Sequence, residues 1–389
     1  MTSPRVHSPE QVARSFQDHF GERGKLFRAP GRVNLIGEHT DYNEGFVLPA
    51  AIDLSCWVAA SPRAGRILKI HSENFEQQEE VSLEDDSSWP RNNWAAYPLG
   101  VAWALAQAGH RLTGCNLYIA GDVPLGSGLS SSAAVEVATA LALLNLAGAK
   151  LERTKIALLC QRAENEFVGA RCGIMDQFIA CRGKSRRALL LDCRTLDAQA
   201  IPLPEGVSLV VCNTMVKHAL AANEYNQRRA ECQEGLRLLR TVLPGALALR
   251  DVSLDELEQH QSLLPPVIYR RCRHVISENA RTQKTAAALL RGSVTELSGW
   301  MAESHRSLRD DFEVSCRELD AMVEIASVQD GVLGARMSGG GFGGATINVV
   351  RSEAVAAFTA AVEREYHRRT EIHPEILAVH AAEGAGEVS

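Results

Sequence analysis

The sequence lacks the features of a secreted or membrane-spanning protein. Its first eleven residues contain no apolar core of the kind that a signal peptide requires. The longest apolar stretches, Trp94–Gly109 and Val137–Ala149, are interrupted by Pro98 and Gly100 or by Asn145, and they are too short to span a bilayer. The 10 cysteines form no C-x-x-C pair and no zinc-type spacing, which predicts reduced, mostly buried thiols. We expect a cytoplasmic protein.

The sequence also has no excess of positive charge. Its formal net charge of -6 argues against a broad surface for nucleic acid or anionic membranes, because those partners require clustered Lys and Arg. A hydrophobic content of 46% and a charged content of 23% are typical of a globular protein. Because 389 residues exceed what one hydrophobic core usually organises, we expect two lobes. The turn-forming residues Pro202, Pro204 and Gly206 place their boundary between residues 204 and 205, which gives lobes 1–204 and 205–389.

Periodicity predicts both helices and strands, with an antiparallel sheet region near the amino terminus. Residues Pro9–Phe20 form an amphipathic pattern typical of a covering helix, whereas Phe46–Ile70 reads as antiparallel strands. The second half is rich in predicted helix from Glu224 to Ser327, and we expect Glu383–Ser389 to be frayed. Further helices are predicted at Ala133–Ala147, Lys155–Val168 and Glu353–Tyr366, and strands at Cys115–Ala120, Ala188–Asp192, Val207–Val211, Gly331–Met337, Ala345–Val350 and Leu377–His380.

A glycine- and serine-rich loop, Pro124–Ser132, stands immediately before the helix predicted from Ala133. Unpaired N–H groups at a helix start attract an anion, and glycine removes the Cβ that would block a phosphate. The loop lacks the G-K-[ST] ending of a Walker motif, and Ser131 replaces the third glycine of a dinucleotide fingerprint. A nucleotide phosphate is therefore one interpretation, and a serine-capped helix after a glycine turn is the other.

Two oxygen-bearing side chains near this loop are candidate magnesium ligands. The Ser132 hydroxyl could bind Mg²⁺ together with phosphate oxygens, and Glu164 on the next predicted helix could supply the carboxylate. Taken alone, Glu164 is more typical of an ordinary solvated charge on a helix than of a metal ligand.

A polar island lies near the amino terminus, where Ala29–Tyr42 places Arg, Asn, Glu, His and Asp among apolar residues and two glycines. Fixed carboxylates and an imidazole can hydrogen-bond several hydroxyls of a sugar at once. The alternative is a solvated turn with a salt bridge.

Together these segments resemble the signature motifs of the GHMP kinase superfamily, and Gly31–Tyr42 is similar to the signature of galactokinases. The resemblance extends over nearly the whole chain through Cys172–Phe178, His305–Phe312 and Ser338–Gly344. It implies a two-lobed α+β GHMP kinase fold with mixed or antiparallel sheets and helices, and with the active site in the cleft between the lobes. It also implies transfer of the γ-phosphoryl group of ATP to O1 of α-D-galactose, which gives galactose 1-phosphate and ADP in the Leloir pathway of galactose catabolism.

The resemblance assigns roles to individual residues. Asp176 is the expected catalytic base, with Arg32 stabilising it and the developing phosphoryl charge. From the residues alone, Asp176 could equally be a helix N-cap. The remaining assignments are Glu38, His39, Thr40, Asp41 and Tyr225 for the sugar; Gly126, Ser127, Gly128, Leu129, Ser130, Ser131 and Ser132 for the triphosphate, with Ser72 as a weaker contact; and Ser132 with Glu164 for Mg²⁺.

Several questions stay open at this level. Ser127 stands where other members have a further glycine, which should change the stiffness of the loop and not the chemistry. The glycine run Ser338–Gly344 either approaches the phosphates or shapes the cleft floor, or it is a flexible hairpin.

Alternative functions are a kinase for N-acetylgalactosamine or a galacturonate, a non-catalytic sensor of galactose and ATP, and a dinucleotide oxidoreductase. The intact Ser130–Ala134 segment and Asp176 disfavour the sensor, and the incomplete glycine fingerprint disfavours the oxidoreductase. We expect a monomer, with a weak dimer as the alternative.

Overall fold

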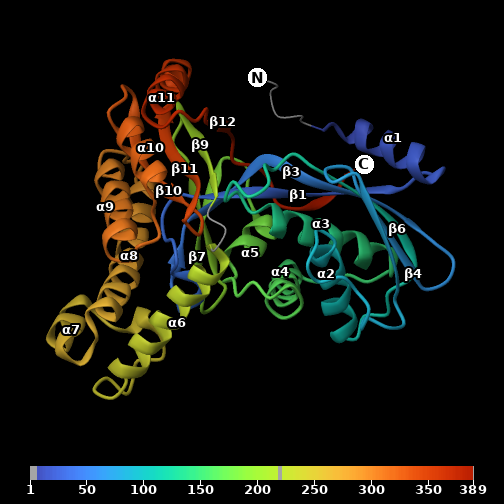
Figure 1. Ribbon diagram of the computed structural model, residues 1–389, viewed down its shortest axis with the longest axis horizontal. Coiled ribbons are helices and arrows are strands. Elements are labelled where there is room, and N and C mark those ends of the chain that lie inside the picture. Colours follow the sequence, from blue (N-terminus) through green and yellow to red (C-terminus); the bar gives the residue numbers. More distant parts are fainter. Residues whose placement is uncertain (1–6, 218–220, 389) are drawn as a thin grey trace.

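Two large β-sheets with helices packed on them form the body of the chain (Figure 1). The computed structural model describes residues 7–217 and 221–388. The helices are α1 (Pro9–Phe20), α2 (Ala96–Gln107), α3 (Ser131–Leu146), α4 (Arg153–Arg162), α5 (Met175–Arg182), α6 (Ala221–Leu239), α7 (Leu254–Gln259), α8 (Pro266–Leu290), α9 (Leu297–Asp310), α10 (Arg317–Ser327) and α11 (Val355–Thr370). Among the described residues, no helix combines the length and the apolar composition needed to cross a membrane.

The strands form three sheets of six, four and three strands. They are β1 (Lys25–Asn34), β2 (Phe46–Val47), β3 (Pro49–Pro62), β4 (Ile67–Ser72), β5 (Gln77–Ser82), β6 (Cys115–Gly121), β7 (Arg187–Asp192), β8 (Ala198–Pro202), β9 (Val207–Lys217), β10 (Val332–Ser338), β11 (Gly343–Arg351), β12 (Glu375–Val379) and β13 (Gly386–Val388). Their orders are β13-β1-β3-β6-β4-β5, β10-β11-β9-β12 and β2-β7-β8. All pairs are antiparallel except β4 with β6, so the prediction of mixed and antiparallel sheets is confirmed.

Helices cover both faces of the six-stranded sheet, with α1 on one face and α2 and α3 on the other (Figure 1). Strand β3 is buried along almost its whole length, as expected for a strand that is covered on both sides. Helix α3 carries buried residues around its circumference because it lies between the sheet and α2, α4 and α5. This packing fixes the start of α3 relative to β1.

Helix α1 has the predicted bounds and the predicted covering role. Ser8 and Gln11 form a reciprocal capping box, and Gly21 ends the helix with a φ of 76°. Val12 and Phe16 are fully buried against the outer face of the sheet. A short local pattern therefore determined this element correctly.

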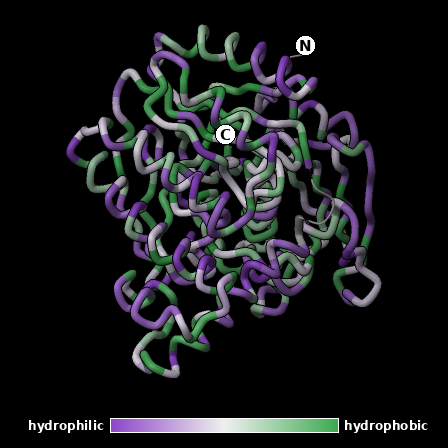
Figure 2. Tube along the Cα trace, turned by 60° about the vertical axis from the view of Figure 1, so that its left-hand side comes forward, coloured by the Kyte–Doolittle hydropathy of each residue, from purple (hydrophilic) through white to green (hydrophobic). Residues whose placement is uncertain are grey.

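The four-stranded sheet organises the second half of the chain. Helices α10 and α11 pack against it through an apolar cluster, and α9 lies against β10. The predicted strand, loop and strand around the glycine run are confirmed, since β10 ends at Ser338 and β11 begins at Gly343. Figure 2 shows apolar stretches running into the interior of the trace and polar stretches along its outer turns.

The structure differs from the sequence predictions at the end of one helix and at the carboxyl terminus. The helix predicted over Lys155–Val168 changes character after Arg162, because Ala163–Val168 forms a wider π-helical turn in which the N–H of Gly169 donates to the carbonyl of Glu164 at 2.9 Å. The expected fraying of Glu383–Ser389 is wrong for the described part of that segment. There, β13 pairs with β1, and the N–H of Ala385 donates to the carbonyl of Ala180 at 2.7 Å.

Removal of the carboxyl-terminal strand should destabilise the protein. A chain that ends at Glu383 loses the pairing of β13 with β1 and exposes the surface under Ala385, which is 7% exposed. We expect the free energy of unfolding to fall by about 2 kcal/mol, measured by urea titration. An unchanged unfolding midpoint would show that the strand contributes nothing to stability.

Candidate active site

Two cavities meet at the loop that precedes α3. The larger cavity, of about 440 Å³, is lined by Cys56, Ser72, Asn74, Phe75, Trp94, Tyr97, Ile119, Gly121, Val123, Leu125, Gly126, Ser131, Ser132, Val135 and Lys217. The smaller cavity, of about 120 Å³, is lined by Arg32, Glu38, His39, Asp41, Cys172, Gly173, Met175, Asp176, Tyr225, Gly339 and Gly340. Ser131 lines the first, and its neighbour Ser130 donates a hydrogen bond to Asp176 of the second. Ser130 and Ser131 thus connect the linings of the two cavities.

The start of α3 is left open towards the larger cavity. Ser130 precedes the helix with a φ of 60° and makes no side-chain cap, because its hydroxyl donates to Asp176 instead. The first N–H groups of the helix therefore keep no side-chain partner, and the positive end of the helix dipole faces the cavity beside Ser131 and Ser132. This arrangement can bind an anion, and the alternative interpretation of a serine-capped helix is wrong.

The other loop residues face different directions. Gly126 lines the larger cavity, whereas the Ser127 hydroxyl turns inward and donates to the carbonyl of Pro124 at 2.7 Å. The carbonyls of Gly128 and Leu129 accept hydrogen bonds from the Arg32 side chain and main chain. Thus Ser127, Gly128 and Leu129 fix the shape of the loop.

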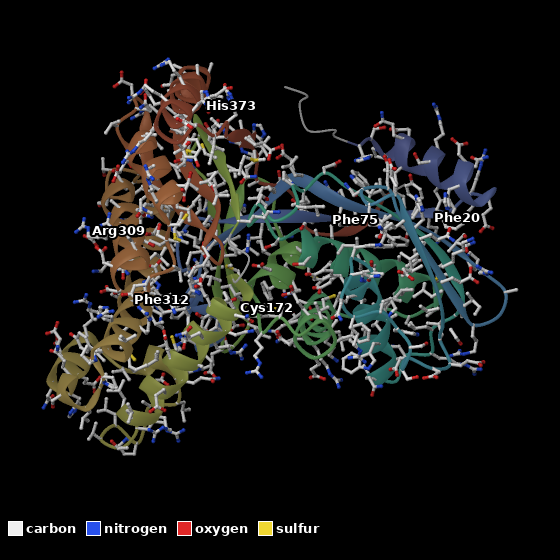
Figure 3. The ribbon with its side chains drawn as sticks, viewed as in Figure 1. Phe20, Phe75, Cys172, Arg309, Phe312 and His373 are labelled. Carbon is white, nitrogen blue, oxygen red and sulfur yellow. The ribbon has the colours of Figure 1, made fainter. Side chains whose placement is uncertain are left out.

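The walls of the larger cavity contain residues that the sequence did not single out. Phe75 and Trp94 stack with ring centroids 6.1 Å apart and an interplanar angle of 15°, which gives a flat apolar surface suited to a heteroaromatic ring (Figure 3 labels Phe75). Ser72, which was predicted, lies at the end of β4 in the same wall. Lys217 crosses the mouth of the loop, and its Nζ donates to the carbonyl of Leu125 at 2.7 Å.

A two-pronged ion pair joins β1 to α5 in the smaller cavity. Arg32 Nε and Nη2 each lie 2.8 Å from one carboxylate oxygen of Asp176, and Ser130 donates to the same carboxylate. The Arg32 side chain is 6% exposed and that of Asp176 is 25% exposed. Because Ile174 is the residue that caps α5, the alternative of Asp176 as an N-cap is wrong. The carboxylate is instead fixed and open to the cavity.

Asp41 lies close to this ion pair, and its ionised form is disfavoured there. Burial, followed by the negative charge of Asp176, raises the pKa of Asp41 to about 6. A Cβ on residue 173 would lie 1.9 Å from Asp41 Oδ2, which explains why glycine occupies that position. The close approach brings the segment before α5 against the polar island, Ala29–Tyr42.

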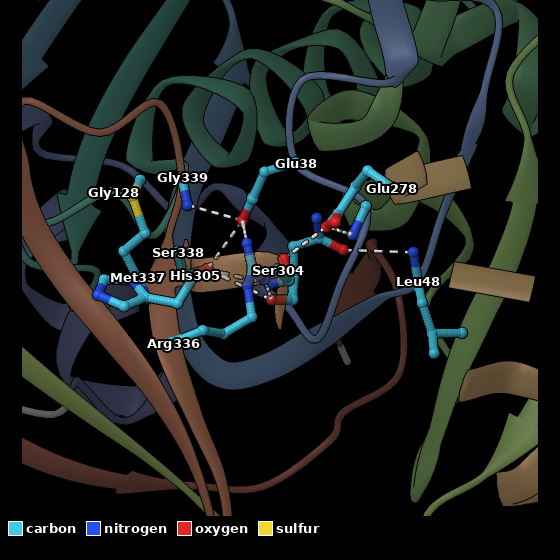
Figure 4. A network of polar contacts seen from close by, with 12 residues as sticks. Glu38, Leu48, Gly128, Glu278, Ser304, His305, Arg336, Met337, Ser338 and Gly339 are labelled. Carbon is cyan, nitrogen blue, oxygen red and sulfur yellow. Dashed lines mark hydrogen bonds and ion pairs between the residues drawn. The ribbon is translucent and has the colours of Figure 1, made fainter. Parts of the chain in front are cut away.

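Glu38, His39 and Tyr225 line the same cavity as predicted. Burial lowers the pKa of His39 to about 3, so the ring is neutral near pH 7 and can both donate and accept. Its Nδ1 lies 2.9 Å from the hydroxyl of Tyr42. Glu38 is held from behind by the glycine run (Figure 4).

Thr40 is the predicted sugar contact that the structure does not place in the cavity lining. It is fully buried, and its hydroxyl lies within hydrogen-bond distance of two main-chain carbonyls to which it can donate, those of Gly37 at 2.8 Å and Phe46 at 2.7 Å. The side chain therefore stabilises the turn that presents its neighbours.

A cluster around Glu164 lies behind Ser132. Burial, followed by the charge of Asp176, raises the pKa of Glu164 to about 7, against hydrogen bonds from Cys172, Ser132 and Gln177. Gln177 Nε2 lies 2.5 Å from Glu164 and 3.1 Å from Glu136, which is fully buried. The alternative of Glu164 as a solvated charge is wrong. Figure 3 places Cys172 near the middle of the molecule, beside α6.

This donor set suits a cation that keeps few protein ligands. Within residues 7–217 and 221–388, no group of three or more His, Cys, Asp or Glu side chains could hold a metal ion. Magnesium bound to a nucleotide needs only one or two protein oxygens besides phosphate and water, and Ser132 with Glu164 supplies that number.

No local pattern marks Lys217 or Trp94 as a site residue. Lys217 ends the long strand β9, and Trp94 precedes α2 in an ordinary loop. Only the assembled fold brings both residues to the wall of the larger cavity.

Comparison with known proteins agrees with this geometry. Residues 14–62 match the galactokinase galactose-binding signature, residues 96–184 match the GHMP kinases N terminal domain, and residues 285–368 match the GHMP kinases C terminal domain. A galactokinase of Chloroflexus aggregans is 48% identical over 92% of both chains, and one of Roseiflexus is 45% identical over 97% of both.

Solved structures match over almost the whole length. The Lactococcus lactis galactokinase, crystallised with galactose, matches with a TM-score of 0.94 and 35% identity over 97% of this chain and 99% of that one. Mevalonate kinase of Methanococcus jannaschii matches with a TM-score of 0.64 at 16% identity over 92% of this chain and 98% of that one, which shows the shared fold alone. The expected GHMP kinase fold is confirmed, and the chain belongs to the galactokinase family of GHMP kinases.

Proposed function

We propose that this chain transfers the γ-phosphoryl group of ATP to O1 of α-D-galactose and releases galactose 1-phosphate and ADP, a step of galactose catabolism. The observation that carries the proposal is the position of Asp176. Its carboxylate lines the smaller cavity, is fixed by Arg32, and is joined through Ser130 to the anion-binding start of α3. A base held between a polar cavity and an anion site is what transfer to a hydroxyl requires.

ATP occupies the larger cavity in this proposal. The triphosphate lies against the open N–H groups of α3, near Gly126, Ser131 and Ser132. The base lies against the apolar wall that contains Trp94, and Ser72 contributes a polar contact. Lys217, at the mouth of the loop, supplies a cation for phosphate oxygens.

Ser132 and Glu164 would hold Mg²⁺ beside the nucleotide. When bound, the ion would neutralise charge that develops on the phosphates. The buried Gln177 amide keeps the Glu164 carboxylate in place for this role.

Galactose occupies the smaller cavity, whose lining includes all of the predicted sugar contacts except Thr40. Glu38, Asp41 and the neutral His39 offer acceptors and a donor for sugar hydroxyls, and Tyr225 provides an aromatic wall. The Lactococcus lactis relative was crystallised with galactose. If Asp41 accepts from the axial O4, a sugar with the opposite configuration leaves a buried group unpaired, at a cost of about 1–3 kcal/mol.

Positioning of the reactants contributes more to this phosphoryl transfer than activation of the nucleophile does. Asp176 accepts the proton of the O1 hydroxyl as that oxygen attacks the γ-phosphorus, while Arg32 keeps the carboxylate oriented and stabilises the phosphoryl charge. The O1–phosphorus bond forms, and the bond to the β-phosphate oxygen breaks. Because the transition state is loose, geometry and electrostatics supply most of the acceleration.

We also propose that the chain divides into lobes 1–204 and 205–389, acts as a monomer and works in the cytoplasm. Galactose and MgATP are its partners.

A parallel assay with four sugars tests the proposed function. ADP release is measured with galactose, glucose, N-acetylgalactosamine and galacturonate at equal concentrations, and galactose should give by far the highest rate. Nucleotide hydrolysis that does not depend on any sugar would contradict the proposal, and a preference for another of the sugars would replace galactose as the substrate.

Replacing the proposed base should remove turnover and leave sugar binding. We expect Asp176→Ala to lower kcat by about 1,000-fold or more, because proton acceptance and charge positioning are both lost. Calorimetry should still detect galactose binding. Asp18→Asn, an exposed change on α1, is the control and should keep the wild-type rate. A residual rate for Asp176→Ala within tenfold of the wild type would rule out the base assignment.

The Asp41 carboxylate should lower the stability of the fold while it strengthens galactose binding. Its carboxyl pKa is raised from 3.8 to about 6 in the folded chain, so the folded state holds this proton more tightly than the unfolded state. The ionised group therefore costs stability as pH rises through this window, and the full cost is present above about pH 6.

We expect Asp41→Asn to raise the free energy of unfolding by about 2–3 kcal/mol near pH 8, and by less near pH 5. Urea titrations without ligand at the two pH values measure the difference. The same variant should raise the KM for galactose by about tenfold or more. An equal gain at both pH values would contradict the titration argument.

A further inference from the structure

Arg336, on β10, is a buried cation that lines neither cavity. Its residue is 0% exposed, and together with Arg271 it is among the largest fully buried side chains of the chain. A guanidinium group keeps its charge in any protein environment, so a buried arginine must be compensated by a carboxylate or by carbonyl oxygens. The identity of those partners indicates what the residue does.

Both partners of Arg336 belong to the polar island, Ala29–Tyr42, which forms part of the smaller cavity. Nη1 donates to the carbonyl of Asn34 at 2.9 Å, and Nη2 lies 3.1 Å from Glu38 Oε1 (Figure 4). Among the described residues, Glu38 is the one carboxylate within ion-pair distance of this guanidinium. The contact joins β10 to a segment that precedes it by about 300 residues.

The same oxygen of Glu38 accepts two hydrogen bonds from the glycine run, in addition to its ion pair with Arg336. The N–H of Gly339 donates to Oε1 at 2.8 Å, and the Ser338 hydroxyl lies 3.3 Å from it. Within the described part of the chain, no hydrogen bond occupies Oε2. Oε1 of Glu38 thus accepts hydrogen bonds from Gly339 and Ser338 and lies in ion-pair contact with Arg336, whereas Oε2 remains available to the cavity that Glu38 lines.

The main chain of the polar island is fixed by a separate set of contacts. Glu278 on α8 accepts the N–H of Gly37 at 2.9 Å and the Ser304 hydroxyl at 2.7 Å, and its other oxygen pairs with Arg281 at 2.8 Å. His274 Nε2 lies 3.1 Å from the carbonyl of Glu38. The polar island therefore keeps main-chain supports that do not involve Arg336, whereas the Glu38 side chain depends on Arg336 and the glycine run.

We propose that Arg336 is a positioning residue for sugar binding, which holds the Glu38 carboxylate so that its second oxygen faces a galactose hydroxyl. This inference rests on the proposed function. It also gives the glycine run a role on the sugar side, because Gly339 supplies a main-chain donor to the same carboxylate oxygen.

A double-mutant cycle tests the coupling, with galactose binding measured by calorimetry and KM values for both substrates measured by ADP release. We expect Arg336→Met and Glu38→Gln each to raise the Kd and KM for galactose by about tenfold or more, with the KM for MgATP within about twofold of wild type. The double variant should bind galactose within about twofold of Glu38→Gln alone, because Arg336 acts through Glu38.

Arg271→Met is the matched control. Arg271 is equally buried, but it pairs with Glu231 and Glu313 at 2.7 and 2.6 Å, and it lines neither cavity. It should lower the unfolding midpoint and leave the KM for galactose within about twofold of wild type. If Arg336→Met does not fold, Arg336→Lys keeps the charge and loses the fork, and should still weaken galactose binding selectively.

Three outcomes would overturn the positioning role. Arg336→Met or Arg336→Lys with wild-type galactose affinity would do so, as would effects of Arg336→Met and Glu38→Gln that multiply independently, or an Arg271→Met that weakens galactose binding equally. Wild-type protein that binds no galactose would refute the proposed function as well, so the two failures are distinguishable.

Discussion

The two-pronged ion pair between Arg32 and Asp176 is the interaction on which the rest of the site depends. Arg32 belongs to β1 and Asp176 to α5, and the start of α3 joins them through the Ser130 hydroxyl. Three elements from the amino-terminal sheet and its covering helices are thus fixed around one carboxylate. Because two parallel hydrogen bonds define both distance and angle, the pair orients Asp176 more strictly than a single contact would.

The surroundings of this pair are costly for the folded state. Burial and the neighbouring Asp176 raise the pKa values of Asp41 and Glu164 to about 6 and about 7, so negative charge is concentrated where apolar packing would be more stable. Such groups are tolerated where a ligand compensates them. A magnesium ion near Glu164 and sugar hydroxyls near Asp41 would provide that compensation, which connects the electrostatics of the site with its proposed substrates.

Local signals predicted the parts of the molecule that local chemistry determines. The helix over Pro9–Phe20 and the phosphate loop before α3 follow from capping residues, periodicity and glycine positions. The residues Glu38, His39 and Asp41 were identified together because they lie within one short segment. Thr40 could not be separated from them by sequence, since only the fold shows that its hydroxyl faces two main-chain carbonyls.

Long-range pairing determined what sequence reasoning missed. The tail from Glu383 carries no strong strand pattern, and its order arises from β1, more than 350 residues earlier. Lys217 lines the larger cavity and Arg336 contacts Glu38 of the smaller one because β9 and β10 belong to one sheet, with β11 between them. Neither residue stands in a recognisable motif of its own, so the assembled sheet is the signal.

A crystal structure with galactose and a non-hydrolysable ATP analogue bound together would test the central claim most directly. The account predicts that O1 of the sugar lies within hydrogen-bond distance of Asp176, about 3 Å, on a line towards the γ-phosphate, with the Arg32 fork intact. A sugar whose O1 points away from Asp176, or a carboxylate released from Arg32 and turned out of the cavity, would contradict it.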